Sequence, residues 1–146
     1  MSQFFKTHEF DSPDTPGSGK LMCQVFVQAL DVARGAYGLP MRITSGYRTK
    51  AYNKVLQGRG YAAASKSSHL FGCAADIACS DETLIKMLNA FWFAGFRRFG
   101  IMNSAIHVDS DAQKPRPTMW SYSNEDTARW KAAKKWFDEK LKEQNT

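Results

Sequence analysis

The chain has 146 residues, enough for one domain with a hydrophobic core of its own, and its 43% hydrophobic and 23% charged residues are close to globular averages. Three cysteines argue against a disulfide framework, and no apolar run reaches the roughly 18 residues that a membrane span needs. A net charge of +6 favours anionic partners without distinguishing nucleic acid, acidic lipid and cell-wall polymer.

The N-terminal half is predicted to contain two helices and a short strand. Residues 1–10 lack a signal-peptide pattern, so we expect synthesis in the cytoplasm. Residues 41–44 alternate and predict a strand, 49–57 look helical, and 58–66 form a loop. Before the strand, apolar side chains at helical spacing predict a core helix whose buried face would hold Leu21, Val25, Ala29, Val32 and Ala36.

The C-terminal half is predicted to alternate between strands and helices. Strands are expected over 74–79, 98–102, 105–109 and 119–122, and helices over 84–94 and 124–146. Ser123 and Asp126 resemble the capping box of the last helix. The link Asn103-Ser104 makes a hairpin whose second strand places His107 and Asp109 on one face. That face is either a site or a polar surface exposed to solvent.

Residues 67–77 contain a candidate metal-binding pair, His69 and Asp76. Imidazole and carboxylate are both zinc ligands, but a helix would separate positions seven residues apart by about 10 Å. We therefore expect His69 at the end of a loop, a bend at Gly72, and Asp76 on the following strand. The alternative is an unrelated surface histidine and a strand-terminal aspartate.

Two further features bear on the site. Tyr47 and Arg48 follow the first strand, where functional side chains often lie, so we expect both to contact substrate. An arginine there can bind a carboxylate or stabilise an oxyanion. The alternative is a surface arginine in one ion pair. Cys73 and Cys79 flank Asp76 and are either a thiolate ligand or, more simply, buried thiols.

Three motifs occur in order: Ser-Gly-Tyr-Arg (45–48), Ser-x-His-x-x-Gly-x-Ala-x-Asp (67–76) and His-x-Asp (107–109). Together they resemble the zinc D-alanyl-D-alanine carboxypeptidase family of peptidoglycan peptidases, which shares its fold with lysostaphin-type peptidases and the Hedgehog signalling domain. The resemblance covers about residues 5–122, and the lead-in at 10–14 looks like small phage-encoded members.

The resemblance implies an α+β fold, a small antiparallel sheet with flanking helices, in a single peptidase-like domain over 1–146 with a C-terminal helix at 124–146. It implies that one Zn²⁺ per chain is bound by His69, Asp76 and His107. It further implies that Arg48 binds the substrate carbonyl or C-terminal carboxylate, and that Ser67 contacts substrate.

The sequence departs from the family at the general base. Many relatives carry an acid three positions before the last zinc histidine, where this chain has Ser104, and some carry a histidine two positions before, where it has Ala105. Asp109 is the acid nearest to His107, so we expect it to act as the base or to orient that ligand.

The function implied is zinc-dependent hydrolysis of D-amino-acid peptide bonds in peptidoglycan stem peptides, as carboxypeptidase or endopeptidase. A phage or prophage endolysin, acting as a monomer, best explains how such an enzyme reaches the wall without a signal peptide. It would arrive there through cell lysis or in a virion. The absent acid at Ser104 favours a rival, a non-catalytic zinc-binding domain for wall binding or virion assembly. A third possibility, a nucleic-acid-binding module, has only weak support from the net charge and the pair Arg97-Arg98. The alternative for this pair is two solvated arginines.

Overall fold

A computed structural model describes residues 2–61 and 63–145, which contain a five-stranded sheet and four α-helices. The strands are β1 (Ile43–Ser45), β2 (Ala74–Ala78), β3 (Arg98–Ile101), β4 (Ala105–Asp109) and β5 (Thr118–Ser121). The helices are α1 (Gln24–Tyr37), α2 (Lys50–Gly58), α3 (Leu84–Phe93) and α4 (Ala128–Gln144). Short 3₁₀ helices lie in the connections: η1 (Thr7–Phe10), η2 (Ser18–Leu21) and η3 (Ser68–Phe71).

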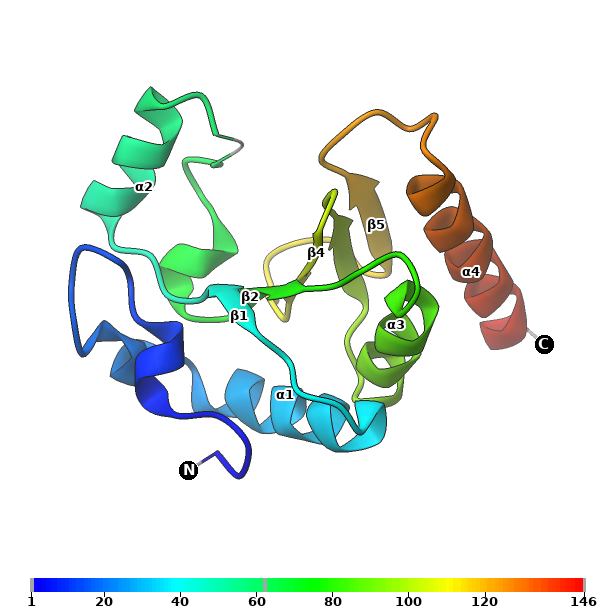
Figure 1. Ribbon diagram of the computed structural model, residues 1–146, viewed down its shortest axis with the longest axis horizontal. Helices are drawn as coiled ribbons and strands as arrows, with labels where there is room; N and C mark the ends of the chain where they lie inside the picture. Colours follow the sequence, from blue (N-terminus) through cyan, green and yellow to red (C-terminus); the bar gives the residue numbers. More distant parts are fainter. Residues whose placement is uncertain (1, 62, 146) are drawn as a thin grey trace.

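The sheet has the strand order β1-β2-β4-β3-β5, and the α+β class predicted from the sequence is confirmed (Figure 1). The sheet is mixed rather than purely antiparallel, because β5 pairs in parallel with β3 while the other pairings are antiparallel. After β4 the chain returns through residues 110–117 to the end of the sheet where β3 begins. The backbone N–H of Thr118 then donates to the carbonyl of Arg97, 2.9 Å away, which starts β5 in the direction of β3.

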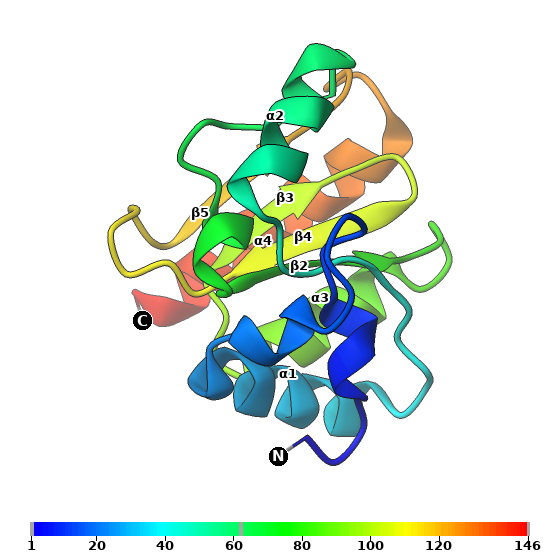
Figure 2. The same cartoon turned by 90° about the vertical axis from the view of Figure 1, so that its left-hand side faces the viewer.

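One face of the sheet packs against α1, α3 and α4 and forms the hydrophobic core (Figures 1 and 2). Alternation along the strands directs Ile77, Phe99 and Ile106 to this face, where each is fully buried. The Phe99 ring contacts Trp136 of α4 with 5.5 Å between ring centroids. The opposite face carries the polar residues of β2 and β4, with η3 and α2 standing beside it. No helix in the described part of the chain is long and apolar enough to cross a bilayer.

The helix α1 forms where predicted, but the face predicted to be buried is wrong. The stripe through Val25 and Val32 is exposed, at 73% and 49%, and the buried stripe is displaced by one position. It contains Phe26, Leu30, Ala33 and Tyr37, spaced four, three and four residues apart. Both stripes have helical periodicity, and the one with the larger side chains buries more apolar surface against α3.

This difference predicts unequal stability effects along α1. Leu30 is fully buried, so Leu30→Ala is expected to lower the free energy of unfolding by about 2–5 kcal/mol. Val25→Ala, on the exposed face, should change it by less than about 0.5 kcal/mol. Chemical denaturation of both variants measures the contrast. Equal losses would mean that α1 packs through the other stripe.

The last helix begins later than predicted. α4 starts at Ala128, and its N-cap is Thr127, whose side-chain oxygen accepts a hydrogen bond from the backbone N–H of Trp130 at 3.1 Å. The predicted capping box of Ser123 and Asp126 therefore does not form. The helix packs through a buried stripe that includes Trp130 and Phe137, as the sequence indicated.

Candidate metal centre

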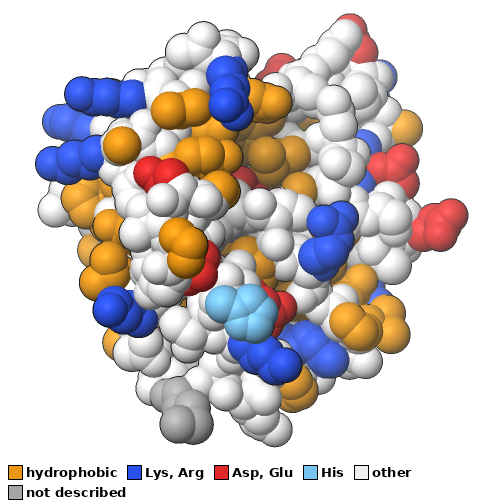
Figure 3. Space-filling model, turned by 60° about the vertical axis from the view of Figure 1, so that its left-hand side comes forward, with side chains coloured by type: hydrophobic (Ala, Val, Ile, Leu, Met, Phe, Trp, Pro, Cys, Tyr) orange, Lys and Arg blue, Asp and Glu red, His pale blue; other side chains and the backbone are white. Residues whose placement is uncertain are grey.

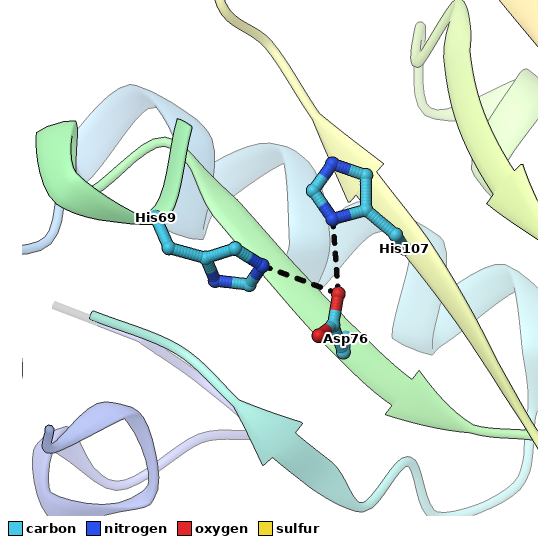
Figure 4. A group of neighbouring side chains, drawn as sticks. All are labelled: His69, Asp76 and His107. Carbon is cyan, nitrogen blue, oxygen red and sulfur yellow. Dashed lines mark hydrogen bonds and ion pairs between the residues drawn. The ribbon is translucent and has the colours of Figure 1, made fainter. Parts of the chain in front are cut away.

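Three side chains meet on the polar face of the sheet: His69 from η3, Asp76 from the middle of β2 and His107 from the middle of β4 (Figure 4). Asp76 and His107 are direct partners in the β2–β4 ladder, which brings their side chains together. His69 reaches them because η3 ends at Gly72, whose φ of 69° lets the chain turn into β2. A Cβ at Gly72 would lie 2.7 Å from the carbonyl oxygen of Leu21, so the turn has no room for a side chain at this position.

The spacing of these groups fits a small metal ion. His69 Nε2 and His107 Nδ1 lie 3.2 and 2.9 Å from the same oxygen, Oδ1 of Asp76. Ligand atoms about 2.0–2.1 Å from a tetrahedral Zn²⁺ are separated by about 3.3 Å, close to these values. Within residues 2–61 and 63–145, this is the only group of three potential ligands, with atoms all within 4.8 Å of one another.

Each imidazole is held by a second contact through its other nitrogen. Nδ1 of His69 donates to the carbonyl oxygen of Gly46 at 2.7 Å, which leaves Nε2 free to bind a metal. Nε2 of His107 faces Oδ2 of Asp109 at 2.8 Å, which leaves Nδ1 directed to Asp76. Such outer contacts fix the orientation and tautomer of histidine ligands. The two histidines are therefore arranged to offer different nitrogens to one point.

The charges of the three groups suit a cation. Burial pushes the pKa of Asp76 up, but His69 and His107 outweigh it, so its pKa lies well below the usual value and the carboxylate is ionised. Burial lowers the pKa of His69 more than Asp76 raises it. Burial also lowers the pKa of His107, yet Asp109 and Asp76 outweigh this and the net shift is upward. The two carboxylates that flank His107 therefore favour its cationic form, and a metal ion could supply positive charge at the same place.

Backbone groups of the Ser-Gly-Tyr-Arg segment (45–48) hold His69 in position. The backbone N–H of Arg48 donates to the carbonyl of His69 at 3.1 Å, and that of Tyr47 donates to the carbonyl of Phe10 at 2.8 Å. Gly46 lies so close to Phe10 that an added Cβ would stand 2.7 Å from its Cα. Glycine at this position therefore lets the segment pack closely enough for its carbonyl to reach His69.

Arg48 is directed into the site, and Tyr47 is not. Nη2 of Arg48 lies 3.5 Å from Oδ2 of Asp76, and its Nε donates to Ser45 Oγ at 3.1 Å. Adjacent residues in extended chain point in opposite directions, and Tyr47 packs against the hydrophobic core. We therefore assign no substrate contact to Tyr47, contrary to the expectation from the sequence.

Asp109 stands behind His107, on the side away from Asp76. Its Oδ1 accepts from Arg98 Nε at 2.7 Å and from the backbone N–H of Asp111 at 3.2 Å, while Oδ2 contacts His107. The side chain is buried and both oxygens are engaged. This geometry suits the orienting role that the sequence suggested for Asp109 and does not suit the alternative role of general base.

Arg98 is a buried partner of Asp109, and the expectation that it is solvated is wrong. It is 7% exposed, and its guanidinium also donates to the carbonyl of Pro115 at 2.6 Å. The signal was present in the predicted hairpin, because the register that pairs Phe99 with Val108 sets Arg98 beside Asp109. The composition of the Arg97-Arg98 pair alone does not indicate this contact.

The remaining candidates have structural roles near the ligands. The Ser67 side chain caps η3 by accepting from the backbone N–H of His69 at 3.3 Å, and it also lines a cavity beside the site. Burial raises the pKa of the Cys73 thiol to about 11, and the thiol donates to the carbonyl of Ser68. The Cys79 thiol donates to the carbonyl of Ser80. Neither thiol belongs to the ligand group, so the thiolate alternative is not supported.

Two aromatic rings lie beside the ligands, Trp120 in β5 and Tyr122 just after it, and the sequence did not point to Tyr122. The ring centroids of Trp120 and Tyr122 lie 5.4 and 6.2 Å from that of His107. Gly100, beside His107 on β3, leaves space for both rings, because a Cβ there would collide with them. Burial and the charge of Asp76 raise the pKa of Tyr122, so its phenol remains protonated at neutral pH and can donate a hydrogen bond.

The distribution of basic side chains on the face seen in Figure 3 tests the nucleic-acid interpretation. Lys and Arg side chains are spread around this face rather than gathered in one patch. Arg98, one of the two arginines that favoured nucleic acid, is buried, and Arg97 lies over the Trp92 ring at 3.7 Å. A nucleic-acid interface needs a continuous basic surface, so these arginines do not supply one.

Comparison with known proteins identifies one relationship. A model of the family described as Peptidase M15 matches residues 5–109, most of the chain and all of the motifs that contain His69, Asp76 and His107. The match ends at Asp109, so residues 110–146 lie outside it. A search of the curated proteins finds no match.

Proposed function

Because the chain belongs to the peptidase M15 family, a family of zinc peptidases, we propose that it hydrolyses D-amino-acid peptide bonds in the stem peptides of bacterial peptidoglycan. The observation that carries the proposal is the convergence of His69, Asp76 and His107 in a buried group of metal-ligand spacing. Under this proposal the enzyme acts on the wall as a monomer, after release by phage lysis or as part of a virion.

We assign one Zn²⁺ per chain to these three residues. Zinc supplies a Lewis acid and a bound water whose pKa is lowered towards 7. The chain contributes the orientation of the ligands, through the contacts of Gly46 with His69 and of Asp109 with His107. The donor set of two imidazoles and one carboxylate matches catalytic zinc sites that keep one position for water.

Arg48 and Tyr122 are assigned to stabilise the negative charge that develops on the substrate during the reaction. The Arg48 guanidinium, held by Ser45 and Asp76, faces the same space as the ligands and would donate to the carbonyl oxygen of the scissile bond. The protonated phenol of Tyr122 lines that space as well. Donors aimed at developing negative charge are worth about 2.7–4 kcal/mol each in enzymes. Ser67, at the cavity wall, would contact the peptide.

A second candidate function is a non-catalytic zinc-binding domain, and one observation favours it. Ser104 lines the cleft where relatives carry an acid, and Asp109 is occupied by His107 and Arg98. Of the other carboxylates lining the cleft, Asp11 accepts from the backbone N–H groups of Gly17 and Gly19, and Glu9 accepts through Oε2 from that of Lys6. A domain with no acid at the position of Ser104 could bind wall peptides without cutting them.

Metal content measured together with hydrolysis decides between the two. Purified protein is analysed for zinc per chain, then incubated with peptidoglycan of several chemotypes with and without a chelator, and new amino groups are counted. One zinc per chain and chelator-sensitive release support the peptidase. One zinc with no release on any wall supports the binding domain. Protein that binds no zinc contradicts both.

The orienting role of Asp109 gives a separate prediction. Asp109→Ala is expected to lower zinc affinity by about 10–100-fold, while kcat at saturating zinc stays within about threefold, because the residue acts on His107. Zinc titration and kinetics at saturating zinc measure the two quantities. A general base would instead lose about 10²–10⁴-fold in kcat with zinc fully bound. Asp138→Asn, an exposed carboxylate on α4, is the matched control and should alter neither.

A further inference from the structure

The cleft over the metal centre extends on both sides of it. The first cavity, about 610 Å³, runs from Asp76 toward α2 and the β3–β4 turn. Its wall away from the ligands includes Thr44, Tyr52, Leu56, Arg59, Asn103 and Ser123. These residues come from elements far apart in the sequence, so the cavity is part of the fold rather than a gap within one loop.

The second cavity, about 540 Å³, runs from Asp76 in another direction, along η3 and β5. Its wall includes Ser67, Ser68, Arg98, Lys114 and Trp120. None of these residues lines the first cavity. The two cavities therefore have separate far walls.

The two cavities meet at the reacting centre. Arg48, Asp76 and Tyr122 line both of them. The ligand Asp76 and the two assigned donors thus stand where the cavities join, in the middle of one groove. A substrate in this groove would place its scissile bond near the centre, with peptide on each side.

The size of the groove on each side of the centre distinguishes it from that of an exopeptidase. A peptidase that removes one C-terminal residue needs a short pocket on one side, closed by a group that binds the terminal carboxylate. Each cavity here lies in the range of about 300–1,000 Å³ that encloses a drug-sized ligand, which is more than a single alanine. Arg48 stands beside Asp76 in the shared part, so it does not mark a closed end.

We propose, resting on the proposed peptidase function, that the enzyme cleaves internal bonds of acidic stem peptides as an endopeptidase. Lys114 would select such substrates in the second cavity. Its Nζ donates to Ser68 Oγ at 2.8 Å and lies 3.6 Å from Asp111 Oδ2, and the side chain is 31% exposed. The ammonium is therefore held in place and still open to the groove, where it can bind a carboxylate beyond the scissile bond.

Product analysis tests the endopeptidase assignment. The zinc-loaded enzyme is incubated with a free pentapeptide stem ending in D-Ala-D-Ala, the same peptide with an amidated C-terminus, and a cross-linked stem-peptide dimer. Mass spectrometry identifies the products. We expect fragments of two or more residues and a rate that amidation changes by less than about threefold. Release of D-Ala alone, abolished by amidation, overturns this inference and leaves the peptidase function standing. No cleavage of any substrate overturns both.

Lys114 provides the second test. Lys114→Ala is expected to raise KM about tenfold, the loss of one charge-assisted hydrogen bond, with kcat within about threefold and zinc content unchanged. Amidating the side-chain carboxylates of the substrate should remove the difference from the wild type. Lys131→Ala, at the α4 surface, is the matched control and should have no effect. Unchanged KM, or a rise that persists on the amidated substrate, overturns the role of Lys114.

Discussion

Replacing His107 by alanine is expected to abolish zinc binding and hydrolysis together. The substitution removes the Nδ1 atom that lies 2.9 Å from Oδ1 of Asp76, and two protein ligands do not make a catalytic zinc site. It also removes the group that Asp76 and Asp109 share, so two buried carboxylates lose a common partner. Losing a ligand should weaken zinc binding more than losing a hydrogen bond that orients a ligand. Zinc affinity should therefore fall by more than about a hundredfold.

Zinc analysis, peptidoglycan hydrolysis and far-UV circular dichroism measure this effect on one preparation. Two variants serve as controls. His8→Ala removes an exposed histidine, and Cys73→Ala removes a thiol near the ligands that donates to the carbonyl of Ser68. Both should keep zinc and activity. Hydrolysis that survives in the His107 variant without metal would remove the basis of the proposed function.

Replacing Arg48 by alanine should reduce kcat/KM by about 10²–10³-fold while zinc remains bound. The guanidinium is held by Ser45 and Asp76 at the junction of the two cavities, where the proposed reaction would develop negative charge on the substrate carbonyl. It is not a ligand, so the metal should stay. Steady-state kinetics with zinc analysis separates the two effects.

A conservative substitution at Arg48 tests whether charge alone is sufficient. Arg48→Lys keeps the charge but loses the planar fork, so it should recover only part of the lost rate. Arg34→Ala, which removes a guanidinium lying over the Phe4 ring far from the ligands, is the matched control. A rate for Arg48→Ala within about threefold of the wild type would assign this arginine a purely structural role beside Asp76.

The local pattern of the sequence predicted two parts of the site, and the resemblance to a known family joined His107 to His69 and Asp76. Alternation along residues 105–109 placed His107 and Asp109 on one face, and Gly72 predicted the bend that brings His69 toward Asp76. These features depend on neighbours within one or two turns of chain. They were therefore accessible without knowing how the strands pair.

Other features depend on packing between distant segments, and the sequence did not predict them. The contact of His69 with the Gly46 carbonyl exists because Gly46 packs against Phe10, which no local pattern encodes. The buried face of α1 follows from the side chains it meets on α3. The direction of β5 follows from the return of the chain after β4, and this return also brings Tyr122 to the site.

The ligands differ in how firmly the backbone holds them, and this sets a route for metal exchange. Asp76 and His107 lie within a ladder of five residue pairs at the centre of the sheet, whereas His69 lies on a single 3₁₀ turn. Central ladders open only in rare, large fluctuations, and short peripheral turns open often. Dissociation of the ion is therefore expected to begin with departure of His69, and its rate should follow amide hydrogen exchange in η3 rather than in the β2–β4 ladder.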